Sequence, residues 1–237
     1  MKFTAVAFDL DGTLYPNSSL NIRLVPFLLK ELRLLRAMDK ARRYLRTTGN
    51  YGDNFYDTQA RLMGDILNEP AEKVREKVER LIYRGWEPLF SKIRPFPYVR
   101  ETLDAFRNAG ITMGLLSDFP PEAKLENLKI MEYWKVVLCS EDSGRLKPAP
   151  ASFLVLADRM GTAPENILYV GNSASYDVVG ASGAGMKTAL LKSGWKRRAS
   201  IAVPEKTVSR SSKTDGRSPR PDFTFYDYRQ LRDYVLS

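Results

Sequence analysis

Short apolar runs that each end in polar residues alternate with helical segments along most of this chain. Residues 3–8, FTAVAF, form the first such run, and Asp9 follows it directly. An unbroken apolar run with polar residues at its C-terminal end is typical of a buried strand in a parallel sheet. After Pro95 the pattern recurs. Further strands are predicted over 111–116, 136–139, 167–170 and 187–191, with a short edge strand over 223–225. The alternation predicts an α/β fold with a doubly wound, mostly parallel, Rossmann-like sheet.

Residues 17–91 depart from this alternation, because their apolar residues follow helical spacing only. Leucines recur every three or four residues between positions 24 and 35, and Pro70 marks the start of another helical segment. The stretch therefore predicts an α-helical cap domain inserted after the first strand. We expect residues 1–16 and 92–237 to form the core.

Two residue types narrow the possible chemistry by their scarcity. The chain has no histidine and a single cysteine, Cys139. Ser-His-Asp and Cys-His catalysis, histidine-based metal sites, intrachain disulfides and CxxC motifs are therefore excluded. Catalysis must depend on carboxylates, lysines, hydroxyls and oxygen-bound cations, while Cys139 is expected in a buried strand as a small apolar side chain.

The net charge of +9 is concentrated in two segments, 23–46 and 196–220, each carrying +6. We interpret the first as the solvated face of a cap helix, with steering of anionic substrates or contact with a membrane surface as alternatives. Residues 196–221 are rich in Ser, Arg, Gly and Pro and predict a flexible basic loop within the core. This loop has no interleaved aromatic residues, which argues against nucleic-acid binding.

The chain has no apolar run long enough to span a membrane, and its N-terminus lacks the features of a signal peptide. We therefore expect a cytoplasmic protein, either a monomer or a homodimer.

Polar residues follow four successive predicted strands. They are Asp9, Asp11 and Thr13; Ser117 and Asp118; Lys147; and Asn172 and Asp177. Ligands of open α/β sheets bind at the carboxyl ends of the strands, so these side chains should converge in one crevice. Clustered carboxylates need a cation among them, and oxygen-only ligands favour Mg²⁺. With Lys147 offsetting the charge of a phosphoryl group, Asp9 can serve as the nucleophile and Asp11 as general acid and then base.

The segments FDLDGTLY, LLSD, LKP and VGNSASYDVVGA, in this order, resemble the four motifs of the haloacid dehalogenase superfamily. The resemblance covers residues 1–16 and 92–195, and the helical insert matches the cap found after the first motif in many members. It implies Mg²⁺-dependent hydrolysis of a small phosphorylated metabolite through an aspartyl-phosphate on Asp9. The implied phosphate-binding residues are Ser117, Asp118 and Lys147, and the implied Mg²⁺ ligands are Asp9, Asp11 through its carbonyl, Asn172 and Asp177.

One position departs from the family pattern. The fourth motif of phosphatase members usually begins Gly-Asp, whereas this chain has Gly171-Asn172. An amide oxygen can ligate Mg²⁺ but adds no negative charge, so we expect a lower metal affinity, with Asp177, or Asp118 in addition, compensating. The dehalogenating branch also has Asn near this position, but it lacks the carboxylate that Asp11 provides. A 2-haloacid dehalogenase, a phosphomutase and a non-catalytic binding or scaffold relative remain alternatives, and the particular phosphate ester stays open.

Overall fold

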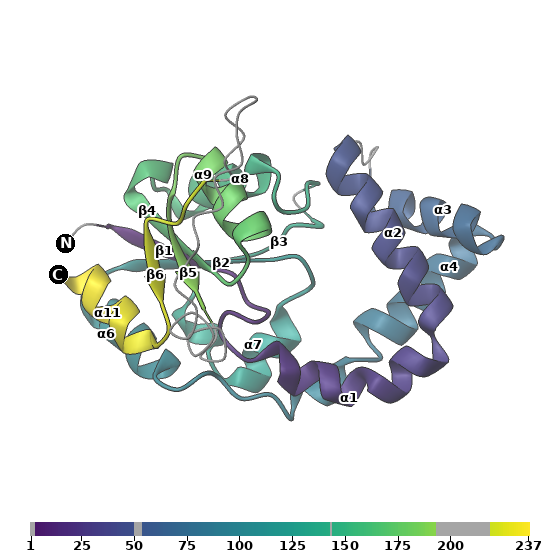
Figure 1. The fold of residues 1–237 in the computed structure, drawn as a ribbon, viewed down its shortest axis with the longest axis horizontal. Helices are drawn as coiled ribbons and strands as arrows, with labels where there is room; N and C mark the ends of the chain where they lie inside the picture. The colour runs from purple at the N-terminus through teal and green to yellow at the C-terminus, as the bar shows by residue number, and fades with distance from the viewer. Residues whose placement is uncertain (1–2, 50–53, 143, 193–218) are drawn as a thin grey trace, which may run out of the picture.

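The structure is a computed structural model that describes residues 3–49, 54–142, 144–192 and 219–237 (Figure 1). Most of the predicted basic loop, 196–218, lies outside the described residues.

In the part of the chain that the structure describes, six strands form one sheet in which every neighbouring pair is parallel. They are β1 (Ala5–Phe8), β2 (Thr112–Ser117), β3 (Val136–Cys139), β4 (Ile167–Gly171), β5 (Lys187–Leu191) and β6 (Phe223–Phe225). Their spatial order, β3-β2-β1-β4-β5-β6, places β1 inside the sheet with the chain winding outward on both sides of it. The predicted fold class is therefore confirmed, and so are the edge strand β6 and the burial of Cys139 in β3.

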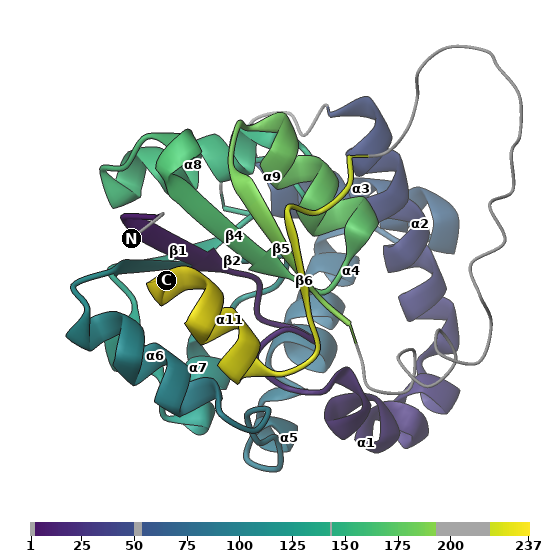
Figure 2. The same cartoon turned by 60° about the vertical axis from the view of Figure 1, so that its left-hand side comes forward.

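Helices cover both faces of the sheet (Figure 2). Because side chains alternate along a strand, Val6 and Phe8 of β1 join one hydrophobic cluster, whereas Ala5 and Ala7 join another. The first cluster lies beneath α6 (Val99–Asn108), α7 (Glu122–Leu128) and α11 (Tyr228–Leu236). The second lies beneath α8 (Pro150–Met160) and α9 (Val179–Gly183).

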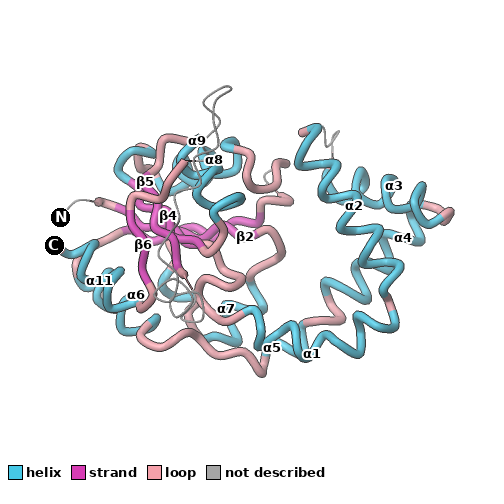
Figure 3. The backbone as a smooth tube through the Cα atoms, viewed as in Figure 1, coloured by secondary structure: helices cyan, strands magenta, loops and turns pink. Residues whose placement is uncertain are grey.

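Residues 17–91 contribute helices and no strand within their described part (Figure 3). The helices are α1 (Asn17–Lys30), α2 (Leu32–Thr48), α3 (Phe55–Leu67), α4 (Ala71–Val78) and α5 (Glu87–Phe90), with a π-helical turn over Glu79–Tyr83. Helices α2, α3 and α4 pack around their own buried cluster, which includes Met38, Met63 and Val74. Leu20, Leu24 and Phe90, by contrast, belong to the first of the two clusters that pack against the sheet. Helices α1 and α5 therefore connect the helical lobe to the rest of the molecule.

Three short elements complete the described fold. They are 3₁₀ turns over Met131–Tyr133 and Pro164–Asn166 and a π-helical turn over Ala174–Val178. The last runs directly into α9. None of the helices in the described ranges is both long enough and apolar enough to cross a bilayer.

Candidate active site

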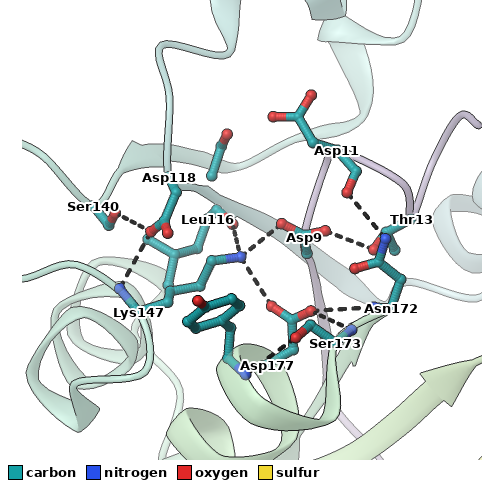
Figure 4. A network of polar contacts seen from close by, with 12 residues as sticks. Asp9, Asp11, Thr13, Leu116, Asp118, Ser140, Lys147, Asn172, Ser173 and Asp177 are labelled. Atoms are coloured by element: carbon teal, nitrogen blue, oxygen red, sulfur yellow. Dashed lines mark hydrogen bonds and ion pairs between the residues drawn. The ribbon is translucent and has the colours of Figure 1, made fainter. Parts of the chain in front are cut away.

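The carboxyl ends of β1, β2 and β4 bring together side chains that are distant in the sequence (Figure 4). Asp9 follows β1, Lys147 lies between β3 and α8, and Asp177 lies on the turn after β4. The Nζ atom of Lys147 is 2.6 Å from Asp9 Oδ1 and 2.9 Å from Asp177 Oδ1. All three side chains are buried. A lysine ammonium thus lies between two buried carboxylates.

Asp9 is held on its other oxygen as well. The hydroxyl of Thr13 donates to Asp9 Oδ2 over 2.6 Å, and the Thr13 carbonyl in turn accepts a hydrogen bond from the Tyr228 hydroxyl. Burial, reinforced by Asp177, raises the pKa of Asp9 to about 7 despite the opposing attraction of Lys147. Burial alone would lower the pKa of Lys147, but Asp177 and Asp9 outweigh it and hold that pKa well above its ordinary value.

Asp177 organises the loop that follows β4. Its Oδ2 accepts hydrogen bonds from the backbone N–H groups of Asn172, at 3.1 Å, and Ser173, at 2.9 Å. A Cβ atom on Gly171 would lie 2.4 Å from the Asp177 carboxyl group. Glycine is therefore needed there so that this carboxylate can approach the strand end.

The side chain of Asp11 points away from Asp9 (Figure 4). Lys124 of α7 binds both carboxylate oxygens of Asp11, at 2.7 and 2.8 Å, and the Tyr15 hydroxyl donates to one of them. The main-chain oxygen of Asp11 accepts a hydrogen bond of 3.1 Å from the Asn172 side-chain amide. The backbone of Asp11, rather than its carboxylate, therefore lies beside the fourth motif.

The two predicted phosphate-binding residues at the end of β2, Ser117 and Asp118, make contacts within the protein. Ser117 is fully buried, and its hydroxyl oxygen accepts a hydrogen bond of 3.2 Å from the Phe119 N–H. Asp118 accepts hydrogen bonds from the Ser140 hydroxyl and from the Lys147 N–H, and it pairs with Arg46 at 2.8 Å. Burial would raise the pKa of Asp118, but the nearby cations Lys147, Arg42 and Arg46 lower it overall.

Two arginines of α2, Arg42 and Arg46, contact the loops that follow β2 and β3. These contacts were not predicted from the sequence. Arg42 is buried and pairs with Glu141, and it also donates to the Asp118 carbonyl over 2.7 Å. Arg46 donates to the Lys147 carbonyl over 2.9 Å. The interpretation of 23–46 as a solvated face is therefore wrong for Arg42, because a buried anion on another part of the chain requires its charge. The signal was the position of Arg42 next to Ala41, on the buried stripe of α2.

A cavity of about 1040 Å³ opens onto these residues. Its lining includes Asp9, Asp11, Lys147, Asn172 and Asp177 together with residues of the helical lobe. Among the residues that the structure describes, no three Asp, Glu, His or Cys side chains are grouped as they would be around a metal ion. The hard oxygen donors of the predicted Mg²⁺ site are nevertheless neighbours. Asp9 and Asp177 share Lys147, and the Asp11 carbonyl touches Asn172.

Known proteins provide an independent comparison. The phosphoglycolate phosphatase of Salmonella paratyphi A is 30% identical over 228 residues, which cover 89% of each chain. Among solved structures, the L-2-haloacid dehalogenase of Xanthobacter autotrophicus with chloropropionic acid covalently bound has a TM-score of 0.65 at 18% identity, and 99% of each chain is covered. A HAD phosphatase from Thermococcus onnurineus has a TM-score of 0.58 at 20% identity, covering 98% of this chain and 97% of the other.

The model of the haloacid dehalogenase-like hydrolase family matches residues 3–185, which contain all four motifs. The match extends from β1 through α9 and so includes every element that positions Asp9, Lys147 and Asp177. The structural neighbours share the same fold over nearly their whole lengths. This chain therefore belongs to the haloacid dehalogenase-like hydrolases.

Proposed function

We propose that the protein is a Mg²⁺-dependent phosphatase that hydrolyses small phosphate monoesters through an aspartyl-phosphate on Asp9. The observation that carries the proposal is the pairing of Asp9 with Lys147 at the end of β1, with a second carboxylate, Asp11, two residues further on. A nucleophile, a cation for the phosphoryl oxygens and an acid for the leaving group are the parts that this reaction requires. The phosphoglycolate phosphatase relative supports phosphoryl chemistry.

In the first step an Asp9 oxygen attacks phosphorus and forms a P–O bond while the ester P–O bond breaks. Asp11, in its protonated form, donates a proton to the departing alcohol oxygen. In the second step Asp11 takes a proton from water, whose oxygen attacks phosphorus and releases inorganic phosphate and free Asp9. Asp11 must turn from Lys124 toward the leaving group for both steps, since its carboxylate now points away from Asp9.

The oxygen donors fit Mg²⁺, which prefers hard ligands and retains several waters. We propose that Asp9, the Asp11 carbonyl, Asn172 and Asp177 hold it, directly or through water. A half-turn of the Asn172 amide exchanges its nitrogen for its oxygen beside the Asp11 carbonyl. When bound, the ion would offset negative charge on the phosphoryl oxygens.

We assign different roles to Ser117 and Asp118, the two residues at the end of β2. Asp118 is a carboxylate that is already bound by Arg46, Ser140 and the Lys147 backbone, so it positions Lys147 and does not contact phosphate. The Ser117 hydroxyl keeps its proton available for a phosphate oxygen, because it accepts rather than donates in its bond with Phe119. Residues 17–91 would form the cap, which closes over the cavity, and residues 1–16 with 92–237 would form the core.

Dehalogenation is the second candidate, because a 2-haloacid dehalogenase shares the fold. At 18% identity this neighbour shows the fold alone, and Asp11 favours phosphoryl transfer. A chloride-release assay with a 2-haloacid, with and without EDTA, separates the two reactions, because only phosphoryl transfer should need Mg²⁺.

The proposal is tested with Asp9→Asn and, as a matched control, Asp39→Asn, which removes an exposed carboxylate of α2. Hydrolysis of a generic aryl phosphate with Mg²⁺ is measured, and circular dichroism reports the fold. We expect Asp9→Asn to abolish turnover and Asp39→Asn to keep it. Undiminished turnover by folded Asp9→Asn protein would refute the mechanism.

A further inference from the structure

The active-site cavity has aromatic side chains from both lobes. Tyr83 and Trp86 come from the helical lobe, Phe90 from α5, and Phe119 from the loop after β2. The Phe119 ring centroid lies 6.4 Å from each of the Tyr83 and Trp86 rings. Leu20, Leu24 and Ile82 also line the cavity and complete this aromatic wall. One side of the cavity therefore favours apolar ligand groups, ring systems above all.

The size of the cavity points the same way. At about 1040 Å³ it lies just above the range of roughly 300–1,000 Å³ that is typical of ligand pockets. A phosphoryl group with a two-carbon alcohol would fill only a small part of this volume. The remaining space adjoins the aromatic wall, so a larger alcohol would displace water from apolar surface, which is favourable.

The cations of the cavity are already paired with acidic residues of the protein. Three cationic side chains are among the described lining residues. The first, Lys147, is bound by Asp9 and Asp177. Lys124, which is buried, binds both oxygens of Asp11. The third cation, Arg84, lies 3.0 Å from Glu79 and 3.0 Å from Glu87.

Acidic residues outnumber these cations. The eight acidic lining residues that the structure describes are Asp9, Asp11, Glu79, Glu87, Asp118, Glu122, Glu126 and Asp177. Glu122 and Glu126 project from α7 with no ion-pair partner among the described residues. Arg42 and Arg46, the nearest arginines of α2, are bound to Glu141 and Asp118. Among the described lining residues, an anionic group on the alcohol portion of a substrate would thus meet eight acidic side chains against three basic ones, even when Asp11 turns away from Lys124.

We infer that the preferred substrate is a phosphate monoester of a bulky, ring-bearing, apolar alcohol that carries no second anionic group. This inference rests on the proposed phosphatase function. It separates the chain from the substrate named in its phosphoglycolate phosphatase relative, because glycolate is small and bears a carboxylate.

Three alkyl phosphates test the inference on the full-length protein with Mg²⁺. Phosphoglycolate has a carboxylate in place of the methyl group of ethyl phosphate, and 2-phenylethyl phosphate adds a phenyl ring to that methyl group. We expect kcat/KM for 2-phenylethyl phosphate to exceed that for ethyl phosphate by about tenfold or more, as burial of a phenyl group allows. Phosphoglycolate should fall below ethyl phosphate by about threefold or more, as a screened charge repulsion gives.

Trp86→Ala supplies a second readout, the ratio of kcat/KM for 2-phenylethyl phosphate to that for ethyl phosphate. Both esters are measured on one preparation, so a loss of folded protein cancels in the ratio. The ratio should fall at least about threefold in Trp86→Ala, since part of the ring's burial is lost. It should keep its value in Tyr44→Ala, which removes an exposed aromatic residue of α2 that does not line the cavity.

The possible outcomes separate the two proposals. Faster turnover of phosphoglycolate than of ethyl phosphate, or no advantage for the ring-bearing ester, overturns the inference and leaves the phosphatase function intact. An unchanged ratio in Trp86→Ala overturns the assignment of the aromatic wall. No turnover of any of the three esters overturns the phosphatase function and the inference with it.

Discussion

Arg42 and Glu141 form a buried ion pair between α2 and the loop after β3, and the replacement Arg42→Met tests its energetic role. The two side chains are 5% and 0% exposed, and they lie 99 positions apart in the sequence. Methionine keeps much of the length and apolar surface of the arginine stem but removes the charge and every hydrogen bond of the guanidinium group. The change would leave Glu141 buried with the Tyr83 hydroxyl, 3.0 Å away, as its remaining strong donor.

The expected cost follows from these contacts. Removing one member of a buried ion pair typically destabilises a protein by about 3–5 kcal/mol, because the other charge stays buried without a counter-ion. The lost bond to the Asp118 carbonyl adds to this cost, whereas protonation of Glu141 would relieve part of it, since burial already raises the pKa of that carboxyl group. We therefore expect a loss of about 3 kcal/mol, or roughly 6–12 °C in Tm for a chain of this size.

Urea denaturation monitored by circular dichroism measures this loss, with Arg43→Met as the matched control. Arg43 is the next residue of α2, and its ion pair with Asp39 is 68% and 61% exposed, so its removal should cost at most about 1 kcal/mol after solvent screening. The double variant Arg42→Met/Glu141→Gln should recover part of the loss, because no unpaired charge remains. Equal effects of Arg42→Met and Arg43→Met would refute the argument from burial.

Three further predictions concern the proposed reaction. Lys147→Met should lower kcat for an aryl phosphate by about 10²-fold or more, because one preorganised cation is lost. Steady-state kinetics with saturating Mg²⁺ measure this loss, and a decrease in kcat of less than about threefold would contradict the prediction. Burial gives Asp9 a pKa of about 7, so a proton must leave before its oxygen can bind metal. Calorimetry should then show the Mg²⁺ affinity weakening up to about tenfold per pH unit below 7 and levelling off above it, whereas a flat profile would count against Asp9 as a ligand. Asn172→Asp should tighten Mg²⁺ binding by about tenfold through one added negative charge, and weaker binding in the same titration would remove Asn172 from the ligand set.

The sheet could be predicted from the sequence because its signals are local. Each buried strand is a short apolar run, and β3 and β5 begin and end where the runs over 136–139 and 187–191 do. The parallel arrangement then brings the strand ends to one edge of the sheet. For this reason Asp9, Lys147 and Asp177 could be expected to meet, and Lys147 does lie within hydrogen-bonding distance of both carboxylates.

The directions of side chains could not be predicted in this way. Lys124 lies 113 positions from Asp11, and no local period links α7 to the loop after β1. The positions of the strand ends therefore predict that Asp11 faces the same centre as Asp9, whereas its carboxylate is turned toward Lys124. Asp118 is a similar case, because its partner Arg46 lies in the inserted helices, 72 positions away. Contacts between separately folded segments depend on how those segments dock, which residue spacing does not encode.

The charges at the end of β1 explain why the proposed ligands should bind together. When Asp9 is ionised, the buried group of Asp9, Lys147 and Asp177 has two negative charges and one positive charge, which leaves an excess of about one negative charge. A phosphate monoester dianion alone would increase this excess, and Mg²⁺ alone would reverse its sign, and either change is costly in a buried site. The two together add no net charge. The site can therefore exchange internal ion pairs for contacts with metal and phosphate while its total charge stays constant. Because the two ligands favour each other's binding, the release of phosphate should lower the affinity of the site for Mg²⁺.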